Sequence, residues 1–172
     1  NCSPAFLTAE IHLLRRQEGQ CAAAAQIRTW LEESDLATRP GKSIQDPYSF
    51  RCAPQVHGAC MDLINWATNI ASREINAITD NPIQLHNGDM VSGGNFHAEP
   101  LAFASDSLAM ALSELANISE RRLYQLICGN RGLPDFLTKD PGLSSGYMIV
   151  QYAAAAAVSM NKQLSSPSSV DS

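Results

Sequence analysis

Residues 98–128 decide the fold of this chain, and they read AEPLAFASDSLAMALSELANISERRLYQLIC. Leucines recur there at helical spacing with alanines between them, which indicates a long helix with an apolar face. Acidic Glu99 and Asp106 lie toward its start and Arg121–Arg122 near its end, as the helix dipole favours. At a rise of about 1.5 Å per residue the helix would span roughly 45 Å. Helices of this length pack in bundles or across subunits, so the stretch predicts an all-α, long-helix bundle.

Two further helices are predicted before this stretch. The first covers residues 8–33, with Thr8 as its cap and Gly19 as the place where it is weakest or breaks. The second covers residues 54–78, where apolar residues at helical spacing form a wide stripe that would face a core. Asn81–Pro82 ends it, because the residue before a proline favours extended backbone.

One small β-hairpin and a fourth helix complete the predicted elements. Residues 83–91 are typical of a hairpin with a two-residue turn at Asn87–Gly88. After a stretch rich in Pro and Gly, the fourth helix covers residues 145–164. Ser144 or Ser145 is its expected cap.

The composition is that of a globular chain with one domain. Of its 172 residues, 45% are hydrophobic and 17% are charged, so it can bury a core. We expect a single unit with an N-terminal helix and loop over residues 1–44 and an active-site loop with long helices over 45–172. The net charge of −5 and the absence of a Lys/Arg run argue against nucleic acid or membrane surfaces as partners. No apolar run reaches the roughly 20 residues of a spanning helix.

The five cysteines are odd in number and irregularly spaced, without a Cys-x-x-Cys pair. This favours free thiols in a reducing compartment, so we expect a cytoplasmic protein. The chain begins at Asn1 without a methionine and stops in the serine-rich residues 165–172, so we expect a piece of a longer protein.

The most informative short stretch for chemistry is residues 45–52, which read QDPYSFRC. Pro47 suits the first turn of a helix, and in such a turn Tyr48 and Arg51 share one face because residues three apart are neighbours. A guanidinium can hold a carboxylate in two places while a phenol beside it relays a proton. The pattern therefore suits a small zwitterionic substrate. The alternative is structural, with Arg51 paired to a local acid such as Asp46.

Other candidate chemistries have simpler explanations. Residues 142–146 fit the G-x-S-x-G pattern of a nucleophile elbow, but a poor strand precedes them, and helix capping by the serines explains them better. His57 and Cys60 stand three apart on a helix, without the second pair that a zinc site needs. His97 and Glu99 lie at a helix start, where Glu99 serves the dipole. We therefore expect no metal site.

Several ordered blocks together resemble the aromatic amino acid lyase family, and within it the histidine ammonia-lyases. The blocks are residues 45–58 (QDPYSFRCAPQVHG), 79–82 (TDNP), 92–100 (SGGNFHAEP), 119–122 (SERR), 132–134 (GLP), 145–148 (SGYM) and 167–172 (PSSVDS). The resemblance extends from about Ile11 to the last residue. It implies a homotetramer of long helices, active sites that draw on more than one subunit, and elimination of ammonia from an amino acid.

The resemblance also implies roles for individual residues. Arg51 would hold the substrate carboxylate and Tyr48 would help proton transfer beside the electrophile. Gln45 would hydrogen-bond in the same pocket, with Phe96 lining it and Asn95 beside Phe96. We expect Gln45, Tyr48, Arg51 and Phe96 to converge on one cavity. The electrophile of the family is 4-methylideneimidazole-5-one (MIO), which forms from an internal Ala-Ser-Gly.

The sequence departs from the family pattern in several places. No Ala-Ser-Gly occurs in these 172 residues, so the MIO precursor would lie outside them. Ser144 replaces a usual Asn, and Met160 stands where histidine lyases often carry Glu. The expected function is a part of a histidine ammonia-lyase, which converts L-histidine to urocanate, and the part alone is expected to be inactive. The alternatives are a tyrosine or phenylalanine ammonia-lyase or aminomutase, and a non-catalytic helical oligomerisation module.

Overall fold

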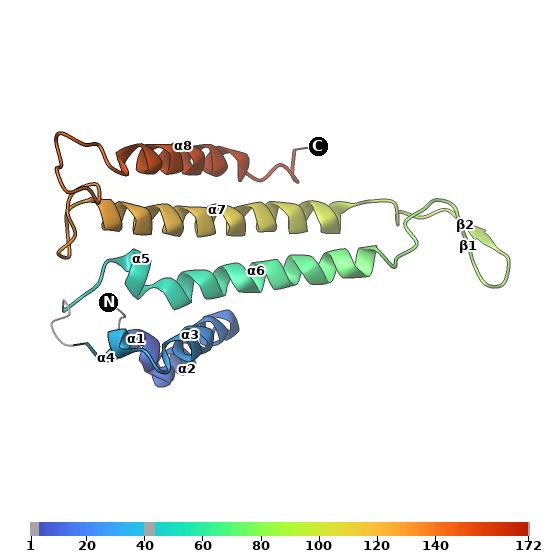
Figure 1. The fold of residues 1–172 in the computed structure, drawn as a ribbon. Coiled ribbons are helices and arrows are strands. Elements are labelled where there is room, and N and C mark those ends of the chain that lie inside the picture. The colour runs from blue at the N-terminus through green and yellow to red at the C-terminus, as the bar shows by residue number, and fades with distance from the viewer. Residues whose placement is uncertain (1–3, 40–43, 172) are drawn as a thin grey trace.

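A computed structural model describes residues 4–39 and 44–171 of the chain (Figure 1). Most of these residues are helical, and the strands among them form one two-stranded sheet. The predicted all-α class with one small hairpin is therefore confirmed for the described part of the chain. Residues 40–43 of the predicted N-terminal loop lie outside it.

Three long helices form the frame of the molecule: α6 (Ala53–Glu74), α7 (Glu99–Ile127) and α8 (Met148–Leu164). Helix α7 lies between α6 and α8, and α3 (Glu18–Leu31) packs on the other side of α6 (Figure 1). The short helices α1 (Pro4–Leu7), α2 (Ala9–Arg15) and α4 (Asp35–Thr38) gather around α3, while α5 (Tyr48–Arg51) precedes α6. The helices thus form one stack in the order α3, α6, α7 and α8.

The limits predicted for α7 are one residue too wide at each end. Ala98 and Cys128 are its cap residues. The chain turns away at Gly129, whose φ of 69° lies in the left-handed region that glycine adopts without strain. A side chain there would also strike the carboxylate of Asp135. The strong leucine and alanine pattern therefore located this helix almost to the residue.

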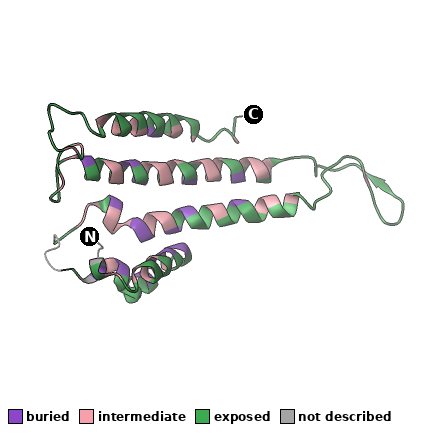
Figure 2. Cartoon of the chain, viewed as in Figure 1, coloured by how far each residue is buried: buried purple, intermediate pink, exposed green. Residues whose placement is uncertain are grey.

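The core of the stack consists mostly of small side chains. Along α7, Ala104, Ala111 and Ile118 are buried at seven-residue spacing, whereas Leu112 is 53% exposed. In the predicted stripe of α6, Cys60 and Ala67 are buried. Figure 2 shows buried residues in short patches along the helices and exposed residues over the hairpin and most of α8. Small buried residues let the helices approach closely, but they leave large apolar side chains outside.

Helix α8 buries little against α7, because Val158 is the one buried residue among the described residues of α8. Polar contacts therefore help to hold the two helices together. Glu120 of α7 is 4% exposed and accepts hydrogen bonds from the neighbouring Arg121 and from Gln151 of α8, the latter at 3.0 Å. The hydrogen bond from Arg121, against the opposing effect of burial, lowers the pKa of Glu120. Near the other end, Asp106 accepts the backbone N–H groups of Ser168 and Ser169.

The N-terminal region differs from the single helix predicted over residues 8–33. Thr8 is the N-cap of α2, as expected, but the break lies at Arg16, which adopts a left-handed φ of 60°. Gly19 is not the break. It is buried in the first turn of α3, where a side chain would collide with the backbone of Gly58 on α6. The glycine serves close packing between two helices.

The second helix and the hairpin also differ in detail from the prediction. Helix α6 ends at Glu74 instead of residue 78, and Ile78 is 68% exposed. Strands β1 (Ile83–Gln84) and β2 (Met90–Val91) pair antiparallel. The Gly88 N–H donates to the Leu85 carbonyl at 2.9 Å, so the turn spans residues 86–88 and not the two predicted residues.

Helix α8 begins three residues later than predicted. Its N-cap residue is Tyr147, and the predicted serine cap is wrong. The hydroxyl of Ser144 instead accepts the N–H of Gly146 at 3.3 Å, within the loop before the helix. Serine favours such local turns because its hydroxyl competes for nearby backbone groups.

The chain exposes much more surface than a compact protein of its size. Its accessible surface is 11731 Å², whereas a compact monomer of 18.6 kDa exposes about 8,200 Å² by the scaling of area with mass. The exposed large apolar residues include Trp30, Tyr48, Phe96, Ile149 and Tyr152. Such surface is typical of a part that packs against further protein. Among the described residues, no helix has the length and apolar character needed to span a membrane.

Candidate functional site

The short helix α5 carries the residues predicted to bind an amino acid. Pro47 precedes it, and the Pro47 carbonyl accepts the N–H groups of Phe50 and Arg51 at 3.0 Å each. This single turn brings the Arg51 guanidinium carbon to 4.8 Å from the centre of the Tyr48 ring. The predicted contact between Tyr48 and Arg51 is therefore confirmed.

The structural alternative for Arg51 is wrong, because Asp46 has another partner. A carboxylate oxygen of Asp46 lies 2.6 Å from Arg131 Nη2, and the Asp46 side chain is shielded from solvent while that of Arg131 is partly buried. Within residues 4–39 and 44–171, no ion pair involves Arg51. Its guanidinium remains available to an anion from outside the chain.

A cavity of about 460 Å³ lies beside Tyr48, between α5 and the C-terminal half of α7. Glu114, Asn117, Arg121 and Tyr124 contribute polar groups to its wall. The Tyr48 side chain is 72% exposed, so its ring is accessible from this cavity. Gln45 is exposed in the segment before α5, and neither Gln45 nor Arg51 lines the cavity. Of the four residues expected to converge there, Tyr48 alone does.

Asn95 and Phe96 lie at the opposite end of the molecule from Tyr48. They follow β2 and precede α7, whereas α5 contacts α7 near Arg122 (Figure 1). At about 1.5 Å per residue, this places them roughly 35 Å from α5. Phe96 is 60% exposed. The expected convergence of Phe96 with Tyr48 and Arg51 therefore does not occur within one chain.

The loop that carries Asn95 and Phe96 is tied to the end of α6. The side-chain oxygen of Asn81 accepts hydrogen bonds from the Ser92 hydroxyl at 3.0 Å and from the Gly93 N–H at 2.8 Å. Asn95 donates to the Ile78 carbonyl at 3.4 Å. Sequence reasoning used Asn81 only as a helix end and missed this anchoring role, because two segments eleven residues apart form it.

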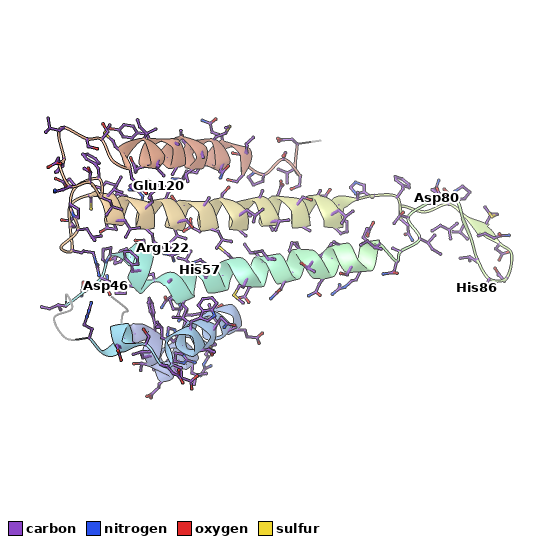
Figure 3. All side chains as sticks on the ribbon, in the orientation of Figure 1. Asp46, His57, Asp80, His86, Glu120 and Arg122 are labelled. Carbon is purple, nitrogen blue, oxygen red and sulfur yellow. The ribbon has the colours of Figure 1, made fainter. Side chains whose placement is uncertain are left out.

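Two arginines next to α5 were also not recognised from the sequence. Arg122 donates from Nε to the Ser49 carbonyl at 2.7 Å and from Nη2 to His57 Nε2 at 2.9 Å. Figure 3 shows Arg122, His57 and Asp46 together at this end of the molecule. Burial, and then the charge of Arg122, lower the pKa of His57. The sequence signal was weak, since Arg122 and Arg131 are more than 70 residues from their partners in α5 and Asp46.

The other chemistries weighed from the sequence find no support in the geometry. Loop residues surround Ser144, so it does not lie between a strand and a helix as a nucleophile elbow requires. His57 Nε2 is engaged by Arg122. Among the described residues, no group of three or more His, Cys, Asp and Glu side chains is arranged to hold a metal ion.

A family model described as aromatic amino acid lyase matches residues 1–172. The chain therefore belongs to the aromatic amino acid lyase family. Histidine ammonia-lyase from Clostridium tetani is 51% identical over 164 residues, an alignment that covers 94% of this chain and 32% of that protein. The chain spans about a third of the length of the curated relatives it matches.

Solved structures share the fold. Histidine ammonia-lyase from Trypanosoma cruzi superposes with a TM-score of 0.85 at 43% identity, over 96% of this chain and 31% of that one. Phenylalanine aminomutase from Pantoea agglomerans gives a TM-score of 0.89 at 27% identity, over 98% of this chain and 37% of that one. The arrangement of α6, α7 and α8 is thus that of part of the larger lyase fold.

Proposed function

We propose that this chain is part of a histidine ammonia-lyase, which converts L-histidine to urocanate and ammonia. The identity to histidine lyases, 51% and 43% in the two relatives above, exceeds the 27% identity to the phenylalanine aminomutase. This difference supports histidine over a tyrosine or phenylalanine lyase or aminomutase.

One observation carries the proposal: Arg51 lies against Tyr48 while the nearby acid, Asp46, is committed to Arg131. A guanidinium without an internal carboxylate partner can hold the carboxylate of an amino acid through two parallel hydrogen bonds. The phenol oxygen of Tyr48 then lies next to the bound substrate and moves a proton during the elimination. Gln45, Asn95 and Phe96 complete the substrate pocket in this proposal.

The family's electrophile, MIO, is proposed as the cofactor of the whole protein. The chain contains no Ala-Ser-Gly, so the group would form in another part of the protein. When bound, MIO supplies an electron acceptor that makes the loss of the amino group easier. The exposed ring of Tyr48 and the open cavity beside it leave room for a further segment to approach. The described residues therefore fit a site whose electrophile comes from outside them.

The active form of the whole protein is proposed to be a homo-oligomer, and specifically the tetramer that the family resemblance implies. Asn95 and Phe96 cannot reach Tyr48 in the same chain, because α7 separates them. A neighbouring copy that runs in the opposite direction would bring its Phe96 end to the Tyr48 end of the first. The large exposed apolar surface supports such an arrangement.

The test is an assay of the full-length protein with histidine, tyrosine and phenylalanine, with urocanate followed by its absorbance. We expect histidine to be preferred. Arg51→Ala should lower kcat/KM by about 10²-fold, because a two-point carboxylate contact is lost, with unchanged helicity by circular dichroism. The control Arg15→Ala changes an exposed arginine on α2 and should keep full activity.

Three other results would each contradict a part of this proposal. Preference for tyrosine or phenylalanine would replace the proposed substrate. Absence of turnover with every amino acid would favour the helical oligomerisation module. Loss of helicity in Arg51→Ala would show that Arg51 stabilises the fold and does not bind substrate.

A further inference from the structure

The segment that carries Tyr48 and Arg51 has little means of holding its own shape. Helix α5 is a single turn of four residues, and such a helix is unstable in isolation. Tyr48 is largely exposed, so packing does not fix its ring. The position of both side chains therefore depends on what holds the backbone and the flanking residues 46–50.

Arg122 holds this segment from the side of α7. Its Nε donates to the Ser49 carbonyl at 2.7 Å, and Ser49 is buried. The last carbonyls of a helix lack partners within the helix, so this hydrogen bond serves a group that α5 cannot satisfy itself. Because Nη2 of the same guanidinium donates to His57 at the start of α6, Arg122 links α5, α6 and α7.

Arg131 holds the segment from the loop after α7. Its Nη2 lies 2.6 Å from the Asp46 carboxylate, and its guanidinium carbon lies 5.4 Å from the centre of the Phe50 ring. The side chains are only 21% and 8% exposed for Arg131 and Asp46. A partly buried arginine that pairs with an acid and stacks on a ring constrains geometry more than a surface ion pair does.

We propose that Arg122 and Arg131 are positioning residues for the elimination reaction. Together they form an arginine clamp that fixes residues 46–50 against α7, so that Tyr48 and Arg51 meet the substrate in one orientation. This inference rests on the proposed function for the identity of the reaction. The clamp itself rests on the four contacts above, which come from parts of the chain 65 to 85 residues away.

The test uses Arg122→Lys and Arg131→Lys in the full-length protein, with Arg15→Lys as the control. Lysine keeps the charge but lacks the planar fork that reaches two partners. We expect kcat to fall about 10²-fold in each clamp variant, since misplacement of reacting groups by about 1 Å has an effect of that size. Backbone amides of residues 49–52 should exchange hydrogen faster, while those of α3 and α8 keep their rates.

A double-mutant cycle separates positioning from general stabilisation. If Arg131 acts through Tyr48, then Arg131→Lys should lower kcat by a smaller factor in a Tyr48→Phe background than in the wild type. A purely structural role would reduce the amount of folded enzyme by the same factor in both backgrounds. Equal factors, or wild-type kcat in both clamp variants, would overturn the proposal.

The outcomes for the two proposals are distinguishable. An active wild type with fully active clamp variants contradicts the clamp and leaves the lyase assignment standing. A wild type that prefers another amino acid contradicts the substrate, and the clamp is then measured with that amino acid. If no amino acid reacts, the proposed function fails, and unchanged amide exchange at residues 49–52 would remove the clamp as well.

Discussion

His57 and Arg122 share one hydrogen bond, and its direction fixes the protonation state of the histidine. Arginine has only donors, so Nε2 of His57 must accept and the imidazole is neutral. Burial, and then the charge of Arg122, lower the pKa of His57 below its ordinary value of 6.5. Protonation would place a cation against a cation and break this contact.

The pH dependence of stability follows from that lowered pKa. As pH falls below 6.5, the unfolded chain takes up a proton at His57 before the folded chain does. The contribution of neutral His57 to the free energy of unfolding is therefore complete above pH 6.5 and is lost as pH falls through the folded pKa. We predict that His57→Gln reduces the loss of Tm between pH 7.5 and pH 5. Glutamine can still accept from Arg122 but does not titrate in this range.

Thermal unfolding of the full-length protein at several pH values checks this prediction. The matched control is His86→Gln, in the exposed turn of the hairpin, which should leave the pH profile as in the wild type. If Tm falls with pH in His57→Gln as it does in the wild type, the loss of stability in acid arises at other groups.

Single-residue predictions from the sequence succeeded where the partners are close along the chain. The contact between Tyr48 and Arg51 follows from a spacing of three in one helical turn. The partner of Asp46 could not be found this way, because Arg131 lies 85 residues further on and beyond two long helices. The sequence therefore identified the residues of α5 as a candidate site but not the arginines that hold it.

At the level of elements, the crossing of α3 and α6 depends on two glycines. Gly19 and Gly58 face each other so closely that a side chain on either would overlap the backbone of the other helix. The Gly19 N–H also donates to the Asp62 carboxylate at 3.3 Å. This crossing fixes the position of α6 relative to the N-terminal helices. Helix α5, which carries Tyr48 and Arg51, directly precedes α6 and is positioned with it.

Gly58→Ala should therefore destabilise the protein although alanine favours helices. The added methyl group must push the two helices apart, and overpacking of this kind costs about 1–3 kcal/mol. Urea unfolding of the full-length protein, followed by circular dichroism, should show a lower midpoint. Gly93→Ala is the control, because open space surrounds that position. Equal midpoints for Gly58→Ala and the wild type would show that the helices adjust without cost.

Element limits were predictable where the pattern is strong and repeated. Helix α7 was located within one residue at each end, because its leucines and alanines continue over 29 residues. The break between α2 and α3 at Arg16 has no sequence signal, since arginine seldom adopts a left-handed φ. The start of α8 was misplaced because Ser144 suits both a helix cap and a local turn.

At the scale of the whole molecule, the candidate site is divided between two ends. Tyr48 and Arg51 lie near the C-terminal end of α7, and Asn95 and Phe96 lie before its start. Sequence blocks identify the residues of a site but not whether one chain or several supply them. The length of α7 explains the separation, because a continuous helix of 29 residues holds its ends roughly 43 Å apart.

The isolated 172-residue chain should consequently be inactive and should self-associate. It contributes only one part of each proposed site, and its surface exceeds that of a compact monomer by roughly 3,500 Å². Light scattering after size-exclusion chromatography should give a mass that is a multiple of 18.6 kDa. Histidine added to the chain should give no urocanate.

A pair of variants shows whether the apolar helix face drives this association. Ile149 and Tyr152 are 64% and 58% exposed on α8, and charges there should weaken contacts between copies, so Ile149→Glu with Tyr152→Glu should lower the measured mass. Ile44→Glu is the matched control, because Ile44 is fully exposed but lies in a connecting segment outside the long helices. A monomer of 18.6 kDa for the unmodified chain would mean that the exposed apolar residues do not bind one another. The proposal that copies of this chain complete each other's sites would then lose its physical basis.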